Sequence, residues 1–253
     1  MIDLSHITSN GRALFLAYDQ GLEHGPTDFN DETIDPEFIL KIGLDGKFNA
    51  IIFQKGIAEK YYSSELKNEL SLIVKLNGKT NLVKDQDPYS PLLCSVDEAI
   101  KLGAVGVGYT VYPGSEFEAK MTEELATVVR EAHAQGIPVV GWMYPRGKNV
   151  PNPTDPEIIA YAARLGLELG ADIVKVQYPG SLESLKHVIQ SAGKTKVVVS
   201  GGKKESEEEF LETARIVVKS GALGMAVGRN IWQSKEPLEV TRKLKEIIFD
   251  QTC

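Results

Sequence analysis

Eight short runs of apolar and β-branched residues recur along the 253-residue chain, and a helical pattern lies between most of them. Near-continuous apolar runs are typical of parallel strands that are covered on both faces, because neither side of such a sheet meets water. Eight strand-then-helix units without a break in composition predict an α/β fold, a closed (β/α)8 TIM barrel that forms a single domain over residues 1–253. The runs are residues 13–19, 50–56, 71–77, 104–112, 138–145, 172–178, 196–202 and 223–230.

Several of the expected helices carry a start signal, in which a hydroxyl residue is followed three positions later by glutamate. In such a capping box each of the two side chains accepts a hydrogen bond from an otherwise unpaired backbone N–H group. The four boxes begin at Ser95, Ser115, Thr154 and Ser206. Residues 60–70 and 78–92 are polar and rich in turn residues, and they carry the weakest structural signal in the chain.

An open, doubly wound sheet is the alternative arrangement of such units. It would carry a glycine-rich dinucleotide fingerprint at its first strand-to-helix turn. The nearest approach, residues 106–111 (GVGYTV), has valine where the third glycine belongs, and a strand rather than a helix follows. The sequence therefore favours the closed barrel.

The charge and the cysteine content exclude several classes of partner. A net charge of -7 and a pI near 5.3 argue against nucleic acid and against an anionic membrane surface. The two cysteines, Cys94 and Cys253, make no disulfide framework or zinc spacing, which fits a reducing compartment such as the cytoplasm. The first residues lack the basic and apolar regions of a signal peptide, and no apolar run approaches the roughly 18 residues of a membrane span.

Two lysines stand inside apolar strands, where a charged side chain is unexpected. Lys175 lies on the same strand face as Ile173 and Gln177. Burial of an unpaired ammonium is costly, so its pKa falls and the neutral amine becomes a nucleophile toward carbonyl groups. The other interpretation is that Lys175 pairs with a carboxylate or lies at a strand end. Lys75 has an equally apolar setting in the third strand, and periodicity does not choose between the two lysines.

The ends of the last two strands are rich in glycine. In a (β/α)8 barrel the active site lies at the C-terminal ends of the strands, and a phosphate group often binds at the loops after strands 7 and 8. Glycine lets backbone N–H groups approach an anion, and the guanidinium of an arginine can donate two parallel hydrogen bonds to phosphate oxygens. The alternative interpretation is that these glycines only form turns. The candidate phosphate-binding residues are Ser200, Gly201, Gly202, Gly228 and Arg229.

The end of the fifth strand offers further candidates. Trp142, Tyr144 and Arg146 are spaced two residues apart, so their side chains point to the same face of the strand and could line a pocket together. A tyrosine hydroxyl held against the reacting atoms can transfer protons, although an ordinary core tyrosine with a hydrogen-bond partner is the more common case. Arg146 and Lys148 suggest a second anion site, which a bisphosphate would need.

The first strand ends at Asp19, and His24 follows in the next loop. An aspartate in this place can be structural or can contact a polar substrate. With Glu23 nearby a metal site is conceivable, but no second histidine accompanies His24 and the ligand count is short. No metal site is therefore predicted.

Long motifs of this sequence resemble those of archaeal-type class I fructose-1,6-bisphosphate aldolases, the DhnA-like group. They stand in the family's order and span nearly the whole chain, so the resemblance is specific. The motifs are LAYDQGLEHGP (16–26), FQKGIAEKYY (53–62), KLNGKT (75–80), GYTVYPGS (108–115), YPRG (144–147), DIVKVQY (172–178), SGG (200–202) and GALGMAVGRNIWQ (221–233).

The resemblance selects strand 6 and implies that Lys175 is the Schiff-base lysine and that Tyr144 donates and accepts protons. The chain departs from the family at Gln20, where the family has histidine, and at Gln177, a position that is often basic. Both departures could change substrate affinity without touching the lysine or the tyrosine. The implied substrate contacts are Asp19, Gln20, His24, Gln54, Trp142, Arg146 and Gln177, and the implied phosphate cradle is Ser200, Gly201, Gly202, Gly228 and Arg229.

The family's reaction is the reversible cleavage of fructose 1,6-bisphosphate to dihydroxyacetone phosphate and glyceraldehyde 3-phosphate, in glycolysis and gluconeogenesis. The resemblance implies that Lys175 forms an iminium with the sugar, which replaces a metal, so no cofactor is expected. It also implies a ring-built homo-oligomer, a decamer. Two alternatives remain, a transaldolase-like sister enzyme of aromatic biosynthesis (2-amino-3,7-dideoxyheptulosonate synthase) and a non-catalytic barrel that binds sugar phosphates.

Overall fold

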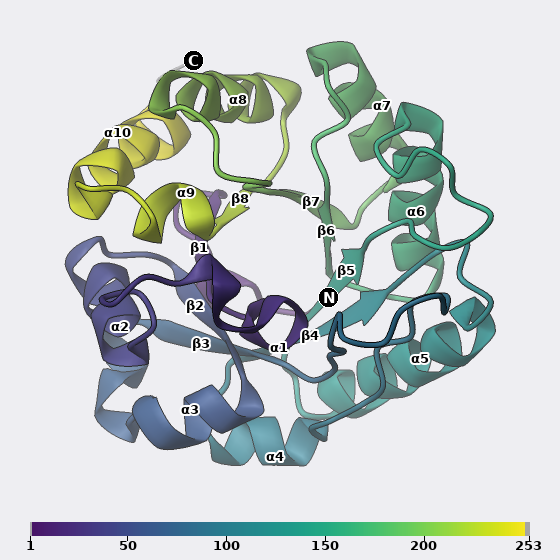
Figure 1. The fold of residues 1–253 in the computed structure, drawn as a ribbon, viewed down its shortest axis with the longest axis horizontal. Helices are drawn as coiled ribbons and strands as arrows, with labels where there is room; N and C mark the ends of the chain where they lie inside the picture. The colour runs from purple at the N-terminus through teal and green to yellow at the C-terminus, as the bar shows by residue number, and fades with distance from the viewer. Residues whose placement is uncertain (1, 251–253) are drawn as a thin grey trace.

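Eight parallel strands close into a barrel in the order in which they occur along the chain, and helices surround the barrel as an outer ring (Figure 1). This computed structural model describes residues 2–250, so Met1 and Cys253 lie outside the described part. The predicted α/β barrel is confirmed, whereas its extent as one domain over residues 1–253 stays a prediction. The strands are β1 (Ala13–Ala17), β2 (Ala50–Gln54), β3 (Ser71–Lys75), β4 (Gly106–Val111), β5 (Val139–Met143), β6 (Ile173–Val176), β7 (Lys196–Ser200) and β8 (Gly224–Val227).

The helices lie between the strands and differ in length. The longer ones cover the outside of the barrel, while two short ones, α1 and α9, stand at strand ends (Figure 1). Within residues 2–250, no helix has both the length and the apolar character needed to cross a membrane. The helices are α1 (Gly21–His24), α2 (Pro36–Asp45), α3 (Lys55–Tyr61), α4 (Val96–Lys101), α5 (Glu118–Ala134), α6 (Pro156–Glu168), α7 (Leu182–Ser191), α8 (Glu207–Ser220), α9 (Arg229–Trp232) and α10 (Pro237–Phe249), with 3-10 turns at Ser5–Ile7, Gly25–Asp28 and Ser64–Asn68.

Alternate strand residues point to opposite sides of the barrel wall, because the strand repeats every two residues. The inward set, which includes Phe15 and Ile173, forms one apolar cluster inside the barrel. The outward set, which includes Val174 and Val176, packs in a second cluster with the helices. Lys175 stands between these two valines in β6, so its side chain faces the barrel interior, as the alternation predicts.

Two of the predicted capping boxes are confirmed, those at Ser95 before α4 and at Ser206 before α8. The box at Thr154 is wrong, because the carboxylate of Asp155 caps α6 instead. The box at Ser115 is also wrong, because α5 begins at Glu118, whose carboxylate accepts a hydrogen bond from the backbone of Gly114. Carboxylates and hydroxyls cap helices about equally well, so the pattern does not separate neighbouring candidates.

Residues 78–92 form neither a helix nor a strand, yet the segment is anchored to the barrel. The buried side chain of Asn77 donates hydrogen bonds to the carbonyl oxygens of Ser90 (2.8 Å) and Thr110 (2.9 Å). It also accepts one from the backbone N–H of Thr110 at 2.7 Å. One amide therefore ties the far end of this segment to the ends of β3 and β4, at the rim where the strands finish.

Candidate active site

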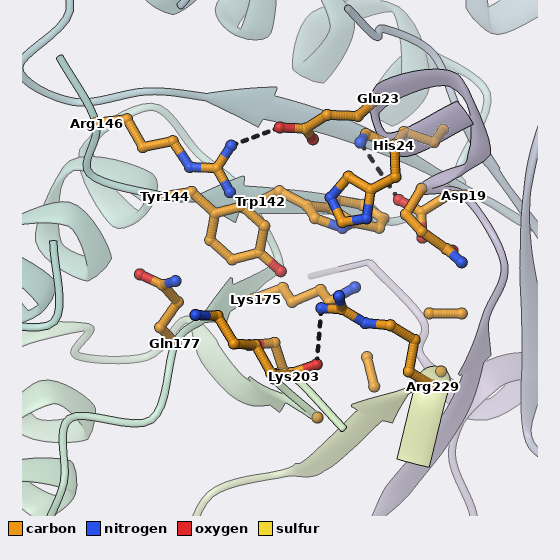
Figure 2. Close-up of a pocket in the computed structure, with 18 residues that line it drawn as sticks. Asp19, Glu23, His24, Trp142, Tyr144, Arg146, Lys175, Gln177, Lys203 and Arg229 are labelled. Carbon is orange, nitrogen blue, oxygen red and sulfur yellow. Dashed lines mark hydrogen bonds and ion pairs between the residues drawn. The ribbon is translucent and has the colours of Figure 1, made fainter. Parts of the chain in front are cut away.

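A cavity of about 300 Å³ opens at the C-terminal ends of the strands, the end at which barrels of this kind carry their active sites. All the predicted site residues except Gln54 line it. Figure 2 shows Tyr144, Trp142 and Lys175 in the middle, with Arg146 and Glu23 on one side and Arg229 on the other. The arrangement places Lys175 between two separate cations, Arg146 and Arg229.

Gln54 does not line the cavity, so the structure does not bring it together with the other predicted substrate contacts. Its amide group donates hydrogen bonds to the backbone carbonyl oxygens of Asn77 (3.1 Å) and Asp19 (3.5 Å). The side chain therefore joins the segments that follow β1 and β3. A glutamine at a strand end is equally compatible with both roles, so the sequence does not distinguish them.

The structure adds three charged residues that were not among the predicted contacts, Glu23, Lys75 and Lys203. Lys203 directly follows the glycine pair of the predicted cradle, and that adjacency is the signal by which it could have been found. Lys148, predicted to help Arg146 bind an anion, does not line the cavity. Its side chain is 65% exposed and lies 3.5 Å from a carboxylate oxygen of Glu116.

The two candidate lysines both lie close to the ring of Trp142. Nζ of Lys175 lies 4.9 Å from the centroid of Trp142, and Nζ of Lys75 lies 5.8 Å from it. The tryptophan fits inside the barrel because β4 has a glycine beside it. A Cβ atom on Gly108 would lie 2.0 Å from the indole ring, so no larger residue is compatible with this ring position.

The charges around the lysines separate them. Lys75 forms an ion pair with Asp19, Nζ to Oδ2 3.3 Å, and both side chains are buried. Burial lowers the pKa of Lys175 to about 8, with Asp19 opposing the shift and Lys75 adding to it. Burial alone would raise the pKa of Asp19, but the two lysines outweigh it and the pKa is lowered. Asp19 is therefore an ionised carboxylate, and the lowered pKa gives Lys175 far more free amine near neutral pH than an ordinary lysine with a pKa of 10.5.

Tyr144 and Arg146 follow the end of β5. Burial raises the pKa of the Tyr144 hydroxyl, and the nearby carboxylate of Asp19 raises it further, so the phenol holds its proton. The guanidinium of Arg146 lies 2.6 Å from a carboxylate oxygen of Glu23 and 5.3 Å from the ring centroid of Tyr112. Figure 2 shows the Arg146–Glu23 pair at the edge of the cavity.

The predicted phosphate cradle is assembled from β7, β8 and α9. Arg229, the first residue of α9, donates a hydrogen bond to the carbonyl oxygen of Gly202 at 3.0 Å. The buried amide of Asn230 donates to the carbonyl oxygens of Gly201 (2.6 Å) and Lys203 (2.9 Å), and so fixes the loop after β7. The carboxylate of Asp28 lies 3.6 Å from Arg229 and 2.5 Å from His24.

Three buried polar atoms in the cavity wall have no hydrogen-bond partner among the described residues, namely Nε2 of Gln20, Nε1 of Trp142 and Oε1 of Gln177. Buried polar groups in folded proteins are nearly always paired, so such atoms at a cavity are candidates for contacts with a polar ligand. In residues 2–250 no group of three or more His, Cys, Asp and Glu side chains could hold a metal ion.

Comparison with known proteins agrees with this geometry. The pattern of the DeoC/LacD family aldolases matches residues 13–234. The class 1 fructose-bisphosphate aldolase of Thermoproteus tenax is 50% identical over 242 residues, which cover 94% of this chain and 90% of the relative. A solved archaeal fructose-1,6-bisphosphate aldolase, whose catalytic lysine is covalently bound to the carbinolamine intermediate of its substrate, is 48% identical over 97% of both chains, with a TM-score of 0.92.

A second solved structure, of a Schiff-base-forming fructose-1,6-bisphosphate aldolase, is 48% identical over 97% of this chain and 98% of its own, with a TM-score of 0.93. These likenesses bear out the resemblance seen in the sequence. This chain belongs to the DeoC/LacD family of aldolases.

Proposed function

We propose that this chain is a class I fructose-1,6-bisphosphate aldolase that works through a Schiff base on Lys175. The observation that carries the proposal is the buried Lys175, whose pKa is lowered to about 8 and which lies between two cationic groups at the strand ends. A neutral amine in such a place attacks a carbonyl carbon. The two cationic groups fit a substrate with a phosphate at each end.

The register of the sheet orients the substrate. Trp142 in β5, Lys175 in β6 and Val198 in β7 lie at one level of the barrel. Ser200 follows Val198 by two residues, whereas Arg146 follows Trp142 by four. Along the chain, the cradle therefore begins closer to the level of Lys175 than Arg146 does. We therefore place the C1 phosphate, next to the reacting C2 carbonyl, in the cradle with Arg229, and the distal C6 phosphate at Arg146.

The reaction then follows with one proton carrier. Lys175 adds to C2, and the carbinolamine loses water to give the iminium, with Tyr144 supplying the proton. The tyrosinate takes the proton of the C4 hydroxyl as the C3–C4 bond breaks, and the bonding electrons move into the iminium to give an enamine. Glyceraldehyde 3-phosphate leaves, Tyr144 protonates C3, and hydrolysis releases dihydroxyacetone phosphate and the lysine. The raised pKa of Tyr144 makes its tyrosinate a strong base for the cleavage step.

Several properties belong to the same proposal. Because the iminium is the electron sink, the reaction requires neither a metal ion nor another cofactor. We further propose the cytoplasmic location that the cysteine content suggests and, from the family resemblance, a homo-decamer. The remaining side chains of the cavity, Asp19, Gln20, His24 and Gln177, would contact the sugar hydroxyls and the phosphates.

One assay tests the proposal. The protein, treated exhaustively with EDTA, should cleave fructose 1,6-bisphosphate, and the Lys175→Met variant should not. Activity that is lost with EDTA and restored by zinc would contradict the Schiff-base mechanism. Condensation to an amino-dideoxyheptulosonate without cleavage of the bisphosphate would favour the sister enzyme, and binding of the sugar phosphate without turnover would favour the non-catalytic barrel.

A further inference from the structure

We propose that Asp87 is a positioning residue, which holds the loop carrying Arg146 so that the guanidinium meets the distal phosphate. The proposal rests on the function proposed above. Asp87 lies in the segment 78–92, which has no regular structure, and it does not line the cavity. Its side chain is nevertheless 6% exposed, and its two carboxylate oxygens reach two different loops.

Both oxygens of Asp87 accept hydrogen bonds from backbone N–H groups. Oδ2 accepts from Glu116 at 2.9 Å, in the loop between β4 and α5, and Oδ1 accepts from Lys148 at 3.0 Å, in the loop between β5 and α6. Among the described residues Asp87 has no lysine, arginine or histidine as an ion-pair partner. A buried carboxylate without a counter-ion is costly unless strong hydrogen bonds satisfy it, so these two bonds are the reason that the charge is tolerated.

The loop that Asp87 holds is the loop of Arg146. Lys148 is two residues beyond Arg146, whose own N–H donates to the carbonyl oxygen of Pro113 at 3.1 Å. Between them, a Cβ atom on Gly147 would lie 2.5 Å from the carbonyl oxygen of Gly114, so the two loops are in direct backbone contact. Asp87, which does not line the cavity, bonds to both loops and so holds them in one relative position.

The consequence concerns selectivity. Displacement of a binding group by about 1 Å can reduce a rate by about 10²-fold, even when the chemistry is untouched. If the loop shifts, the distal phosphate loses Arg146 while the cradle and Lys175 keep their geometry. Loss of Asp87 should therefore weaken the use of fructose 1,6-bisphosphate and spare that of fructose 1-phosphate, which lacks the distal phosphate.

The test is a double-mutant cycle between Asp87→Asn and Arg146→Ala, with both substrates. Asparagine keeps the shape, but its amide nitrogen cannot accept one of the two N–H bonds. We expect Asp87→Asn to raise KM for the bisphosphate by up to about 10²-fold, with kcat and the kinetics of fructose 1-phosphate changed far less. In the Arg146→Ala background the same substitution should add almost nothing, because residues that act through one another are not additive.

Asp172→Asn is the matched control. This aspartate also accepts a hydrogen bond from a backbone N–H, that of Val139 at 2.9 Å, but it precedes β6, at the opposite end of the barrel. It should lower stability without changing the preference for the bisphosphate. If Asp87→Asn does not fold, Ser115→Ala replaces it. This variant removes the neighbouring bond from Ser115 Oγ to the carbonyl oxygen of Pro88 (2.7 Å), together with the bond that Ser115 Oγ accepts from the backbone N–H of Phe117 (3.1 Å). A smaller loss of the same preference is then expected.

Three outcomes would overturn the proposal. The first is an equal loss for both substrates, the second is additive losses in the double variant, and the third is an unchanged preference in a folded Asp87→Asn protein. A wild-type protein that cleaves neither substrate would instead overturn the proposed function and this proposal with it.

Discussion

Lys75 forms an ion pair with Asp19, with Nζ 3.3 Å from Oδ2, and this pair distinguishes the two lysines of the barrel interior. Lys175 makes no ion pair among the described residues, and burial lowers its pKa to about 8. Periodicity alone left the two lysines equivalent. Lys75 has a carboxylate partner, whereas Lys175 has none among the described residues and its pKa is lowered, so the geometry favours Lys175 on physical grounds that are independent of the family resemblance.

Covalent trapping tests this assignment. Borohydride reduces an iminium to a stable amine, so dihydroxyacetone phosphate with borohydride should leave one adduct, which peptide mapping should place on Lys175. Lys175→Met should abolish trapping and cleavage while the barrel stays folded, because methionine suits an apolar pocket. Lys75→Met should still be trapped at Lys175. An adduct on Lys75 would refute the assignment.

The barrel could be predicted because its signals are local. Each strand is an apolar run, and the side-chain alternation that puts Lys175 inside the barrel follows from strand geometry alone. Most of the site residues could be predicted as well. The active sites of such barrels lie at strand ends, and the family resemblance implies which residue carries which role. Thirteen of the fourteen predicted residues line the cavity, whereas Gln54, the last residue of β2, does not.

What could not be predicted depends on contacts between loops that are distant in sequence. The amide of Gln54 donates to the carbonyl oxygen of Asn77, and the ammonium of Lys148 lies near the carboxylate of Glu116, so neither side chain lines the cavity. The segment 78–92 has turn composition without periodicity, so nothing in it indicates that Asp87 is buried. The orientation of these side chains depends on contacts with residues that are distant in the sequence, and no local sequence pattern predicts such contacts.

The pH dependence of cleavage should follow the free amine of Lys175. We expect kcat/KM to rise with pH through about 8, the pKa to which burial lowers this lysine. Lys75→Met removes a positive charge that lowers this pKa, so the rise should move to higher pH. Asp19→Asn removes a negative charge that raises it, so the rise should move to lower pH. Shifts of the same sign in the two variants would contradict the electrostatic picture.

The same titration affects stability. The folded-state pKa of Lys175 lies below its ordinary value of 10.5, so between about 8 and 10.5 the unfolded chain binds more protons. The contribution of Lys175 to the free energy of unfolding should therefore rise with pH in this window. The Lys175→Met variant, which has no such group, should lack that rise in chemical denaturation at matched pH values.

Tyr144→Phe should separate proton transfer from iminium formation. Removing a group with a proton-transfer role typically lowers turnover by about 10²–10⁴-fold. The variant should retain the fold and should still be trapped by borohydride with dihydroxyacetone phosphate, whose iminium can form slowly with water as the proton source. Circular dichroism, trapping and steady-state rates measure the three properties. Near-normal turnover would leave Tyr144 with a packing role only.

Arg229→Ala should weaken the binding of phosphorylated substrates. It removes charge-assisted hydrogen bonds to the phosphate, worth about 1.5–3 kcal/mol, which is roughly 10- to 150-fold in affinity. Arg215→Ala is the control, because Arg215 lies on the exposed face of α8 and pairs only with Glu212 among the described residues. Titration with dihydroxyacetone phosphate and with unphosphorylated dihydroxyacetone distinguishes the roles. An equal effect on both ligands would place Arg229 outside the phosphate site.

Gly228→Ala should damage the cradle without touching any charge. An added Cβ atom would lie 2.7 Å from the carbonyl oxygen of Ala17, the same oxygen that accepts a hydrogen bond from the indole of Trp232 at 3.2 Å. The methyl group would push α9 away from β1, and α9 begins with Arg229. We expect a destabilisation of about 1–3 kcal/mol, typical of an overpacked site, and weaker binding of phosphate ligands.

The matched control for that substitution is Gly56→Ala in α3. No atom lies within 4 Å of the Cβ position that it would add, and Gly56 is helical, so alanine should stabilise the protein by up to about 1 kcal/mol. Opposite signs in thermal denaturation, with phosphate binding impaired only by Gly228→Ala, are the expected result. If Gly228→Ala were tolerated as well as Gly56→Ala, the close approach of β8 to β1 would not be what places Arg229 over the cavity.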